Sequence, residues 1–400
     1  MKKIFYPIFL FMAANAFSAT VITESQSLTL TQYGEYIMGN PFLTITHNYT
    51  GARHYSGYID LNGQLYTQLV IDAKVSSGYF GFNGATFKGQ DPSNMLNIST
   101  TNNATAVHLM THGFIVDNCM VTMDLGTKQQ NDGTLVTVKN NGVLNWSNVP
   151  FSGNRLRIVL GTEGSATDTN SQITLTSASK VYTYGRLTVY NGSFSLTGYE
   201  RLDLDDSIIH ALSQDSTLDY FTIQNEHTFT IGAGITNKIW TNNNVVLFTN
   251  ATLELNSTDV IMKTGGLHCG VYFAQSAPTG NLVLGADNTL NNISAASGTP
   301  HTLNITLNEH TLTVVENIDF NTISVNLTDF GNEMFRFKSE NEDALILSHI
   351  TAWHNDVLLE DITIKNDGEY KYLFSESVPE PAFFAAILGF AALGFAFRRR

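Results

Sequence analysis

The chain has 400 residues, of which 14% are charged and 11% are aromatic, and its formal net charge is −14 at pH 7. The charged fraction lies well below the ~25% typical of soluble domains, whereas 25 Phe and 16 Tyr provide a core and exclude an intrinsically disordered chain. The acidic balance argues against nucleic acid as a partner, because phosphates repel such a surface.

Residues 1–19 have the form of a secretory signal peptide. Two lysines precede an apolar stretch, and small residues follow it. The small-x-small rule for signal peptidase is met at Ala16 and again at Ser18. We therefore expect export through the Sec machinery and removal of this leader by signal peptidase.

Strand patterns dominate the rest of the chain. Polar and apolar residues alternate in runs rich in β-branched and aromatic side chains, which is typical of half-buried strands. Asn and Gly, which tolerate the positive φ of tight turns, separate the runs. The runs lie at 27–31, 65–71, 134–139, 172–176, 186–190, 193–197, 227–231, 251–256, 302–307, 311–315 and 322–327.

This order of strands predicts an all-β fold, a right-handed parallel β-helix or solenoid. Stacked rungs pair backbone groups between turns and leave Asn, Thr and Ser on the outer face. A set of β-sandwich domains is the alternative, although no linker divides the chain. In general style the body resembles the passenger regions of autotransporter adhesins.

Three segments are expected between the leader and the C-terminal tail. Residues 20–125 are irregular, rich in Gly and aromatic side chains, and form a β-rich region or cap at the first end. Residues 126–328 form the solenoid body. Residues 329–377 carry more charge, and because a solenoid needs an atypical unit over its terminal rung, we expect this stretch to be a β cap.

One acidic cluster in the body is a candidate for chemistry. Asp203, Asp205 and Asp206 lie close together, and on a strand Asp203 and Asp205 point to one face. β-Helix polysaccharide lyases and hydrolases use clustered carboxylates for calcium or as acid and base. The favoured interpretation is a solvated polar face, because Arg201 is the only basic neighbour in sequence. No cofactor is therefore expected, and calcium at these three residues is the competing hypothesis.

Histidine and cysteine residues complete no motif. His108 and His112 have the spacing of a metal site, but a zincin helix needs Glu where Leu109 stands. Cys119 and Cys269 are the only cysteines. They either pair in an oxidising compartment or remain two isolated buried thiols, and the sequence leaves both alternatives open.

The C-terminal segment 378–400 has an unusual order of parts. A Pro-Glu-Pro triplet leads into 16 residues without charge or hydrogen-bonding side chains, and three arginines follow. As a helix this run spans roughly 24 Å, close to the ~30 Å of a bilayer core, and the arginines would hold its end on the cytoplasmic side. The residues that define the segment are Pro379, Glu380, Pro381, Arg398, Arg399 and Arg400.

Behind a signal peptide, this segment resembles the tail of the PEP-CTERM proteins of Gram-negative bacteria. The resemblance implies a sorting signal in which Pro379, Glu380 and Pro381 form the recognition segment. It implies recognition by exosortase, a membrane protease-transpeptidase, and delivery to the cell surface or extracellular matrix. The hydrophobic helix would then be a temporary membrane anchor, and a permanent anchor is the alternative.

Together these observations predict an exported protein with a structural or adhesive role rather than an enzyme. Its expected partners are an exosortase-like enzyme, the export machinery, the membrane before processing, and exopolysaccharide. The competing function is a secreted β-helix polysaccharide lyase or glycoside hydrolase that uses the three aspartates.

Overall fold

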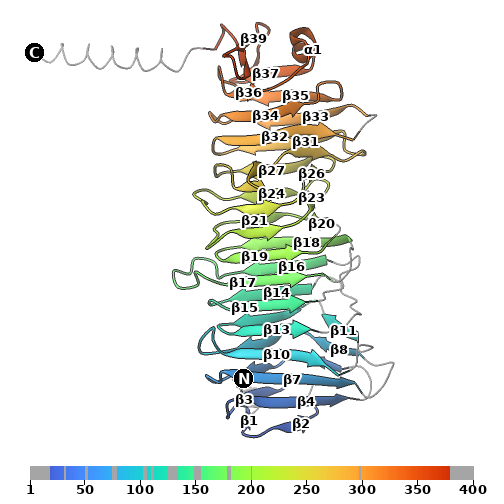
Figure 1. Ribbon diagram of the computed structural model, residues 1–400, viewed down its shortest axis with the longest axis vertical. Coiled ribbons are helices and arrows are strands. Elements are labelled where there is room, and N and C mark those ends of the chain that lie inside the picture. Colours follow the sequence, from blue (N-terminus) through green and yellow to red (C-terminus); the bar gives the residue numbers. More distant parts are fainter. Residues whose placement is uncertain are drawn as a thin grey trace, which may run out of the picture.

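In the computed structural model the chain forms a long parallel β-solenoid (Figure 1). The all-β class and the parallel β-helix predicted from the sequence are confirmed, and the alternative of separate β-sandwich domains is wrong. The structure describes residues 19–30, 33–49, 53–73, 79–101, 106–109, 112–124, 134–147, 155–177, 182–199, 201–296 and 299–378.

The first face of the solenoid runs along its whole described length, and each strand pairs in parallel with the strand one turn later. Its strands are β1 (Thr20–Ile22), β3 (Glu35–Met38), β6 (Tyr58–Asp60), β9 (Ala85–Lys88), β12 (Phe114–Asp117), β14 (Thr134–Lys139), β16 (Arg155–Leu160), β18 (Tyr182–Val189), β21 (Ser207–Ile209), β24 (Thr228–Ile231), β27 (Ala251–Leu255), β31 (Thr279–Leu284), β33 (His301–Thr306), β35 (Ile323–Thr328) and β37 (Ile350–His354).

The second face pairs in the same way and forms a sheet of its own. Its parallel strands are β2 (Gln26–Leu28), β4 (Leu43–Tyr49), β7 (Tyr66–Ala73), β10 (Met95–Thr100), β13 (Met120–Asp124), β15 (Val143–Ser147), β17 (Gln172–Thr176), β19 (Ser193–Thr197), β22 (Ser216–Leu218), β25 (Ile239–Thr241) and β28 (Ile261–Lys263), and the short β29 (Leu267–His268) pairs antiparallel to β28.

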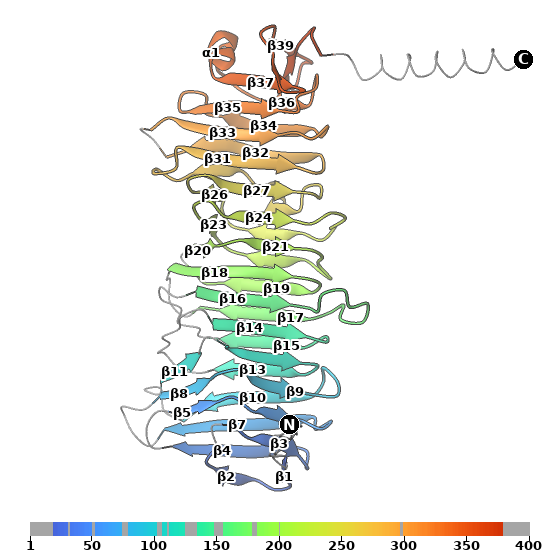
Figure 2. The ribbon, with the colours of Figure 1, turned by 180° about the vertical axis from the view of Figure 1, so that it is seen from behind.

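Other strands occupy a third position in the turn (Figure 2). Near the N-terminal end they form a separate three-stranded sheet, and further along they pair with one another in parallel. They are β5 (Arg53–Tyr55), β8 (Tyr79–Phe82) and β11 (Ala106–Leu109), then β20 (Arg201–Leu204), β23 (Phe221–Ile223), β26 (Val245–Leu247), β30 (Val271–Phe273), β32 (Asn288–Ala295), β34 (Leu312–Ile318) and β36 (Phe335–Phe337).

The C-terminal end of the rod differs from the body. After β36 come a short helix, α1 (Asp343–Ser348), the last first-face strand β37, and three further strands, β38 (Val357–Leu358), β39 (Thr363–Asn366) and β40 (Lys371–Phe374). β40 pairs antiparallel with β36 and β39, so a strand of opposite direction covers the edge of the last turn. Within the described residues, no helix reaches the length and apolarity that crossing a bilayer requires.

Period-two patterns located the strands well. The runs predicted at 134–139, 172–176 and 193–197 coincide with β14, β17 and β19. The run at 27–31 is shorter in the structure, because the backbone N–H of Leu30 donates to Nδ1 of His47 at 3.0 Å instead of continuing the ladder. Where described, the residues predicted as an irregular region at 20–125 pair in parallel from β1 onward.

The core consists of inward side chains stacked turn upon turn. Along the first face, Phe87, Val116, Val138 and Leu160 lie in register and are fully buried. A cluster of rings strengthens the N-terminal half, with the Phe80 and Phe82 centroids 5.2 Å apart at 88°. Edge-to-face pairs of this kind add stability beyond the area that they bury.

Tight turns between strands need backbone conformations that glycine or asparagine allows. Gly113, just before β12, has a φ of +54°, and a Cβ there would lie 1.6 Å from the carbonyl oxygen of Leu135 on the next turn. Gly164 has a similar φ of +68°, but a Cβ there would meet no atom within 4 Å. Both glycines have a positive φ, but only Gly113 also lies against a neighbouring turn. Comparing the two positions therefore distinguishes the effect of backbone strain from that of a steric clash.

The loop between β16 and β17 is organised by one buried carboxylate. Asp168 is fully buried and accepts hydrogen bonds from the backbone N–H groups of Asn140 and Asn141, at 2.7 and 2.9 Å. The hydroxyls of Thr162 and Ser171 donate to it at 2.7 and 2.6 Å. Burial alone raises the pKa of Asp168, but these four donors together hold it below its ordinary value.

We predict that Gly113→Ala destabilises the protein far more than Gly164→Ala. Gly164→Ala costs about 1–2 kcal/mol for its left-handed backbone, and Gly113→Ala adds about 1–3 kcal/mol or more of overpacking against the neighbouring turn. Urea unfolding of the two variants measures the difference. Equal losses would mean that the two turns do not approach as closely as the structure has them.

Asp168→Asn is expected to lower the free energy of unfolding by about 2 kcal/mol at pH 7, because a charged acceptor is lost. The folded pKa is depressed, so the contribution is present above the unfolded value of 3.8 and is lost as pH falls toward the folded pKa. The gap in melting temperature between wild type and variant should therefore shrink between pH 5 and pH 3. A gap independent of pH would contradict this assignment.

Candidate functional site

A column of amide side chains runs along the outside of the first face. Thr252, Asn281, Asn304 and Asn326 lie in register on β27, β31, β33 and β35. The amide of Asn304 donates to the side-chain oxygen of Asn281 at 3.0 Å, and Asn326 donates to Asn304 at the same distance. Asn281 in turn donates to the hydroxyl of Thr252 at 3.2 Å. We call this set the amide ladder.

The sequence carries a signal for the amide ladder that the search for motifs missed. The tetrapeptides Leu-Asn-Ile-Thr at 303–306 and Val-Asn-Leu-Thr at 325–328 are similar and belong to β33 and β35. Their asparagines lie 22 residues apart, which is one turn of the solenoid here. A second polar column, on the second face, is formed by Gln68, Asn97, Thr122, Asn145 and Thr174.

In one column on the outside, charged residues alternate in sign from turn to turn. Asp60, Lys88, Asp117 and Lys139 occupy successive positions of one column on the first face. The Lys139 ammonium lies 3.3 Å from the Asp117 carboxylate. Opposite charges in register stabilise a sheet, whereas like charges destabilise it.

The acidic cluster predicted as a candidate site is divided between two environments. Asp203 on β20 is only 1% exposed, and Arg201 binds it with two nitrogens at 2.5 and 2.8 Å. The hydroxyl of Thr222 donates to the same carboxylate at 2.6 Å. The hydrogen-bonding partners of the Asp203 carboxylate therefore lie within the protein, and its burial leaves it inaccessible to a substrate.

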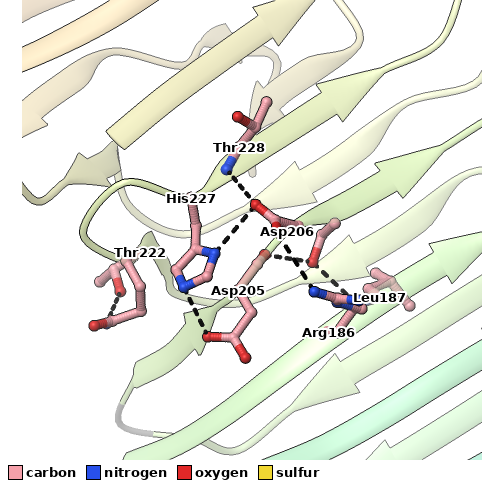
Figure 3. A network of polar contacts seen from close by, with 9 residues as sticks. Arg186, Leu187, Asp205, Asp206, Thr222, His227 and Thr228 are labelled. Atoms are coloured by element: carbon pink, nitrogen blue, oxygen red, sulfur yellow. Dashed lines mark hydrogen bonds and ion pairs between the residues drawn. The ribbon is translucent and has the colours of Figure 1, made fainter. Parts of the chain in front are cut away.

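The other two aspartates lie in the turn after β20 and flank one histidine (Figure 3). Nδ1 of His227 is 3.1 Å from Asp206, and Nε2 is 3.6 Å from Asp205. The backbone N–H of Thr228 donates to Asp206 at 3.1 Å, and Arg186 lies 3.4 Å from it. Burial opposes ionisation of Asp206, but these three neighbours hold the pKa of its carboxyl below its ordinary value.

The three aspartates therefore do not converge. β20 ends at Leu204, so Asp205 lies in a turn and not on the strand face that the sequence predicted for it beside Asp203. Asp203 is bound by Arg201, whereas Asp205 and Asp206 share His227. In the described part of the chain, no three His, Cys, Asp or Glu side chains gather to hold a metal ion.

The other candidate residues are also separated. His108 belongs to strand β11 and His112 to the exposed turn after it, so they do not share a helix. Cys119 and Cys269 are both buried and unpaired, which decides between the two alternatives for them. Burial raises the pKa of Cys119 to about 12 and that of Cys269 to about 11, so neither thiol is a nucleophile near neutral pH.

The residues predicted for export and sorting lie outside the described part of the chain. They are Ala16, Ser18, Pro379, Glu380, Pro381, Arg398, Arg399 and Arg400. The described chain ends at Val378, directly before the Pro-Glu-Pro triplet.

The junction at Val378 is held by side chains from two other segments. The amide of Asn332 donates to the carbonyl oxygens of Ser375 and Val378, each at 3.0 Å, and accepts from the Ser375 N–H at 2.8 Å. Asp361 accepts from the Ser375 hydroxyl at 2.6 Å and from the N–H and hydroxyl of Ser377 at 2.9 and 3.0 Å. We call these contacts the junction clamp. No sequence pattern had indicated it.

A hollow of about 710 Å³ borders the junction. Glu309 and Asp329 give it an acidic lining, and Val378 forms part of its wall. His354 also lines it and bonds through Nδ1 to the carbonyl oxygen of Phe330 at 2.7 Å. The hollow leaves space beside the residue that precedes the triplet.

We predict that Arg201→Ala costs about 3–5 kcal/mol of stability, because it leaves the Asp203 carboxylate buried without its partner. Arg186→Ala is the matched control, since its pair with Asp206 is exposed and is worth about 0–1 kcal/mol. Chemical unfolding of both variants tests the difference. A small loss for Arg201→Ala would show that Asp203 is accessible to solvent after all.

Comparison with known proteins finds one match. A family model described as the PEP-CTERM protein-sorting motif matches residues 377–400. No curated protein and no solved structure matches the chain. The match begins within the junction clamp and continues to the last arginine. The chain thus carries a PEP-CTERM sorting motif at its C-terminal end, joined to a β-solenoid body.

Proposed function

We propose that this protein is a surface-sorted rod with a structural or adhesive role in the exopolysaccharide around the cell. PEP-CTERM proteins are exported and sorted to the cell surface, and the motif implies processing by exosortase. The structural or adhesive role of the solenoid body is what we add to this. The observation that carries it is the repetition of neutral polar side chains on two outer faces.

The amide ladder suits a polysaccharide better than a small ligand. Strands of neighbouring turns lie ~4.8 Å apart, so the ladder offers one amide or hydroxyl group per turn along a straight line. Each contact with a sugar hydroxyl is weak, but many contacts on one rigid body add up without a deep pocket. The low charged fraction, 14%, fits a neutral, hydrogen-bonding surface.

The competing function is a β-helix lyase or glycoside hydrolase. It requires carboxylates that converge on a substrate, with a basic residue nearby. Asp203 is instead bound by Arg201 and Thr222, and Asp206 is engaged by His227 and Thr228. This arrangement favours the non-enzymatic proposal. Release of reducing ends or unsaturated products from a glycan panel by the wild-type protein would favour the enzyme.

The test uses the full chain and exopolysaccharide from cells that carry the sorting machinery. Wild type should co-sediment with the polymer, and binding should change little between low and high salt, because neutral contacts are not screened. The triple variant Asn281→Ala, Asn304→Ala and Asn326→Ala should bind at least several-fold less.

The matched control is the double variant Asn321→Ala and Asn366→Ala, which removes exposed amides outside the amide ladder. It should bind like wild type. Absence of wild-type binding to every polymer tested, together with unchanged cell adhesion when the gene is deleted, would refute the proposed role. Equal loss in the triple variant and the control would show that the ladder is not the contact surface.

A further inference from the structure

The residues just before the sorting motif are part of the folded rod. Ser375 is fully buried and Val378 is 4% exposed. The N–H of Val378 also donates to the Ser375 carbonyl at 3.4 Å, which closes a turn. The chain therefore reaches the Pro-Glu-Pro triplet without a flexible linker on the body side.

The junction clamp comes from two different parts of the C-terminal end. Asn332 lies between β35 and β36, and Asp361 lies between β38 and β39. Asn332 is 8% exposed and uses both its amide nitrogen and its oxygen on the junction. Because the contacts span up to 46 residues, they form only when this end of the rod has folded.

The distance from the clamp to the apolar run is short. Three residues, Pro379 to Pro381, separate Val378 from the run that begins at Ala382. Even fully extended they span at most about 10–11 Å. Whatever enzyme acts at the motif must therefore work close against the end of the rod, and the hollow beside Val378 leaves space for its side chains there.

We propose that sorting depends on the folded end of the rod as well as on the motif, with Asn332 and Asp361 as positioning residues that present the triplet in a fixed place and direction. This inference rests on the sorting function proposed above. It also couples sorting to folding, because a chain whose last turns are unfolded lacks the clamp and presents its motif on a loose segment. A motif that is read as a free peptide would have no need of the clamp.

The decisive variant keeps the junction clamp intact but places a flexible linker between the clamp and the Pro-Glu-Pro triplet. A flexible Gly/Ser linker of about eight residues is inserted after Val378 and ends in a second copy of residues 376–378, so the sequence before Pro379 is unchanged. The control carries the same linker after Gly368, in an exposed turn where the neighbouring space is open. Asn332→Ala is the second variant, and Asn321→Ala is its control.

Each full-length variant is expressed in a host with exosortase, and C-terminal processing is followed by pulse-chase and mass measurement of the C-terminal peptide. Limited proteolysis checks that the body is folded. We expect the Val378 insertion and Asn332→Ala to slow processing at least about tenfold, because misplacement of a reacting group by about 1 Å can cost about a hundredfold in rate. The Gly368 insertion and Asn321→Ala should be processed like wild type.

Wild-type processing of the Val378 insertion would overturn the inference, whatever Asn332→Ala does, because the motif would then be read independently of the body. Slow processing of the Gly368 insertion as well would also overturn it, since the effect would not be specific to the junction. If the wild type itself reached the surface with Arg400 intact, the sorting function proposed above would fail, and this inference with it.

Discussion

Parallel, in-register pairing between successive turns is the constraint on which the whole molecule depends. It places every outward side chain ~4.8 Å from its counterpart on the next turn. Equal charges stacked in this way repel. In the amide ladder the stacked side chains are neutral, and from Asp60 to Lys139 they alternate in sign, whereas Arg157 and Arg186 are a stacked pair of equal charge. The low charged fraction of 14% fits this geometry.

The same pairing between turns determines which polar side chains can be buried in the interior of the solenoid. Most inward positions are apolar, and the two buried carboxylates of the described residues lie where the fold supplies several donors. Asp168 has four donors from two segments, the turn at 140–141 and its own loop, and Asp203 has Arg201 and Thr222. Clustered acidic residues in a β-solenoid are thus not by themselves a catalytic site, because neighbouring turns can neutralise each one separately.

The two ends of the described rod differ in structure. Residues 19–22 begin the first turn, whereas α1 and the antiparallel strands β39 and β40 close the last one (Figure 1). The closing strands also carry the junction that leads into the sorting motif. Covering the last turn and holding residues 375–378 are therefore done by one structural unit, which ties the stability of this end to the proposed sorting step.

The sequence by itself indicated the strands with a clear period-two pattern, the solenoid class and the sorting motif, because each rests on a local pattern: period two at 134–139, turn residues at 140–142, and the order of parts at 378–400. Only the tertiary structure decided the register between turns. Spacings between stacked partners vary, since Val138 meets Leu160 but Leu160 meets Val189. The amide ladder, the division of the aspartates and the junction clamp all depend on that register. Apart from the similar tetrapeptides at 303–306 and 325–328, no sequence pattern marks these contacts, because they join residues a full turn or more apart.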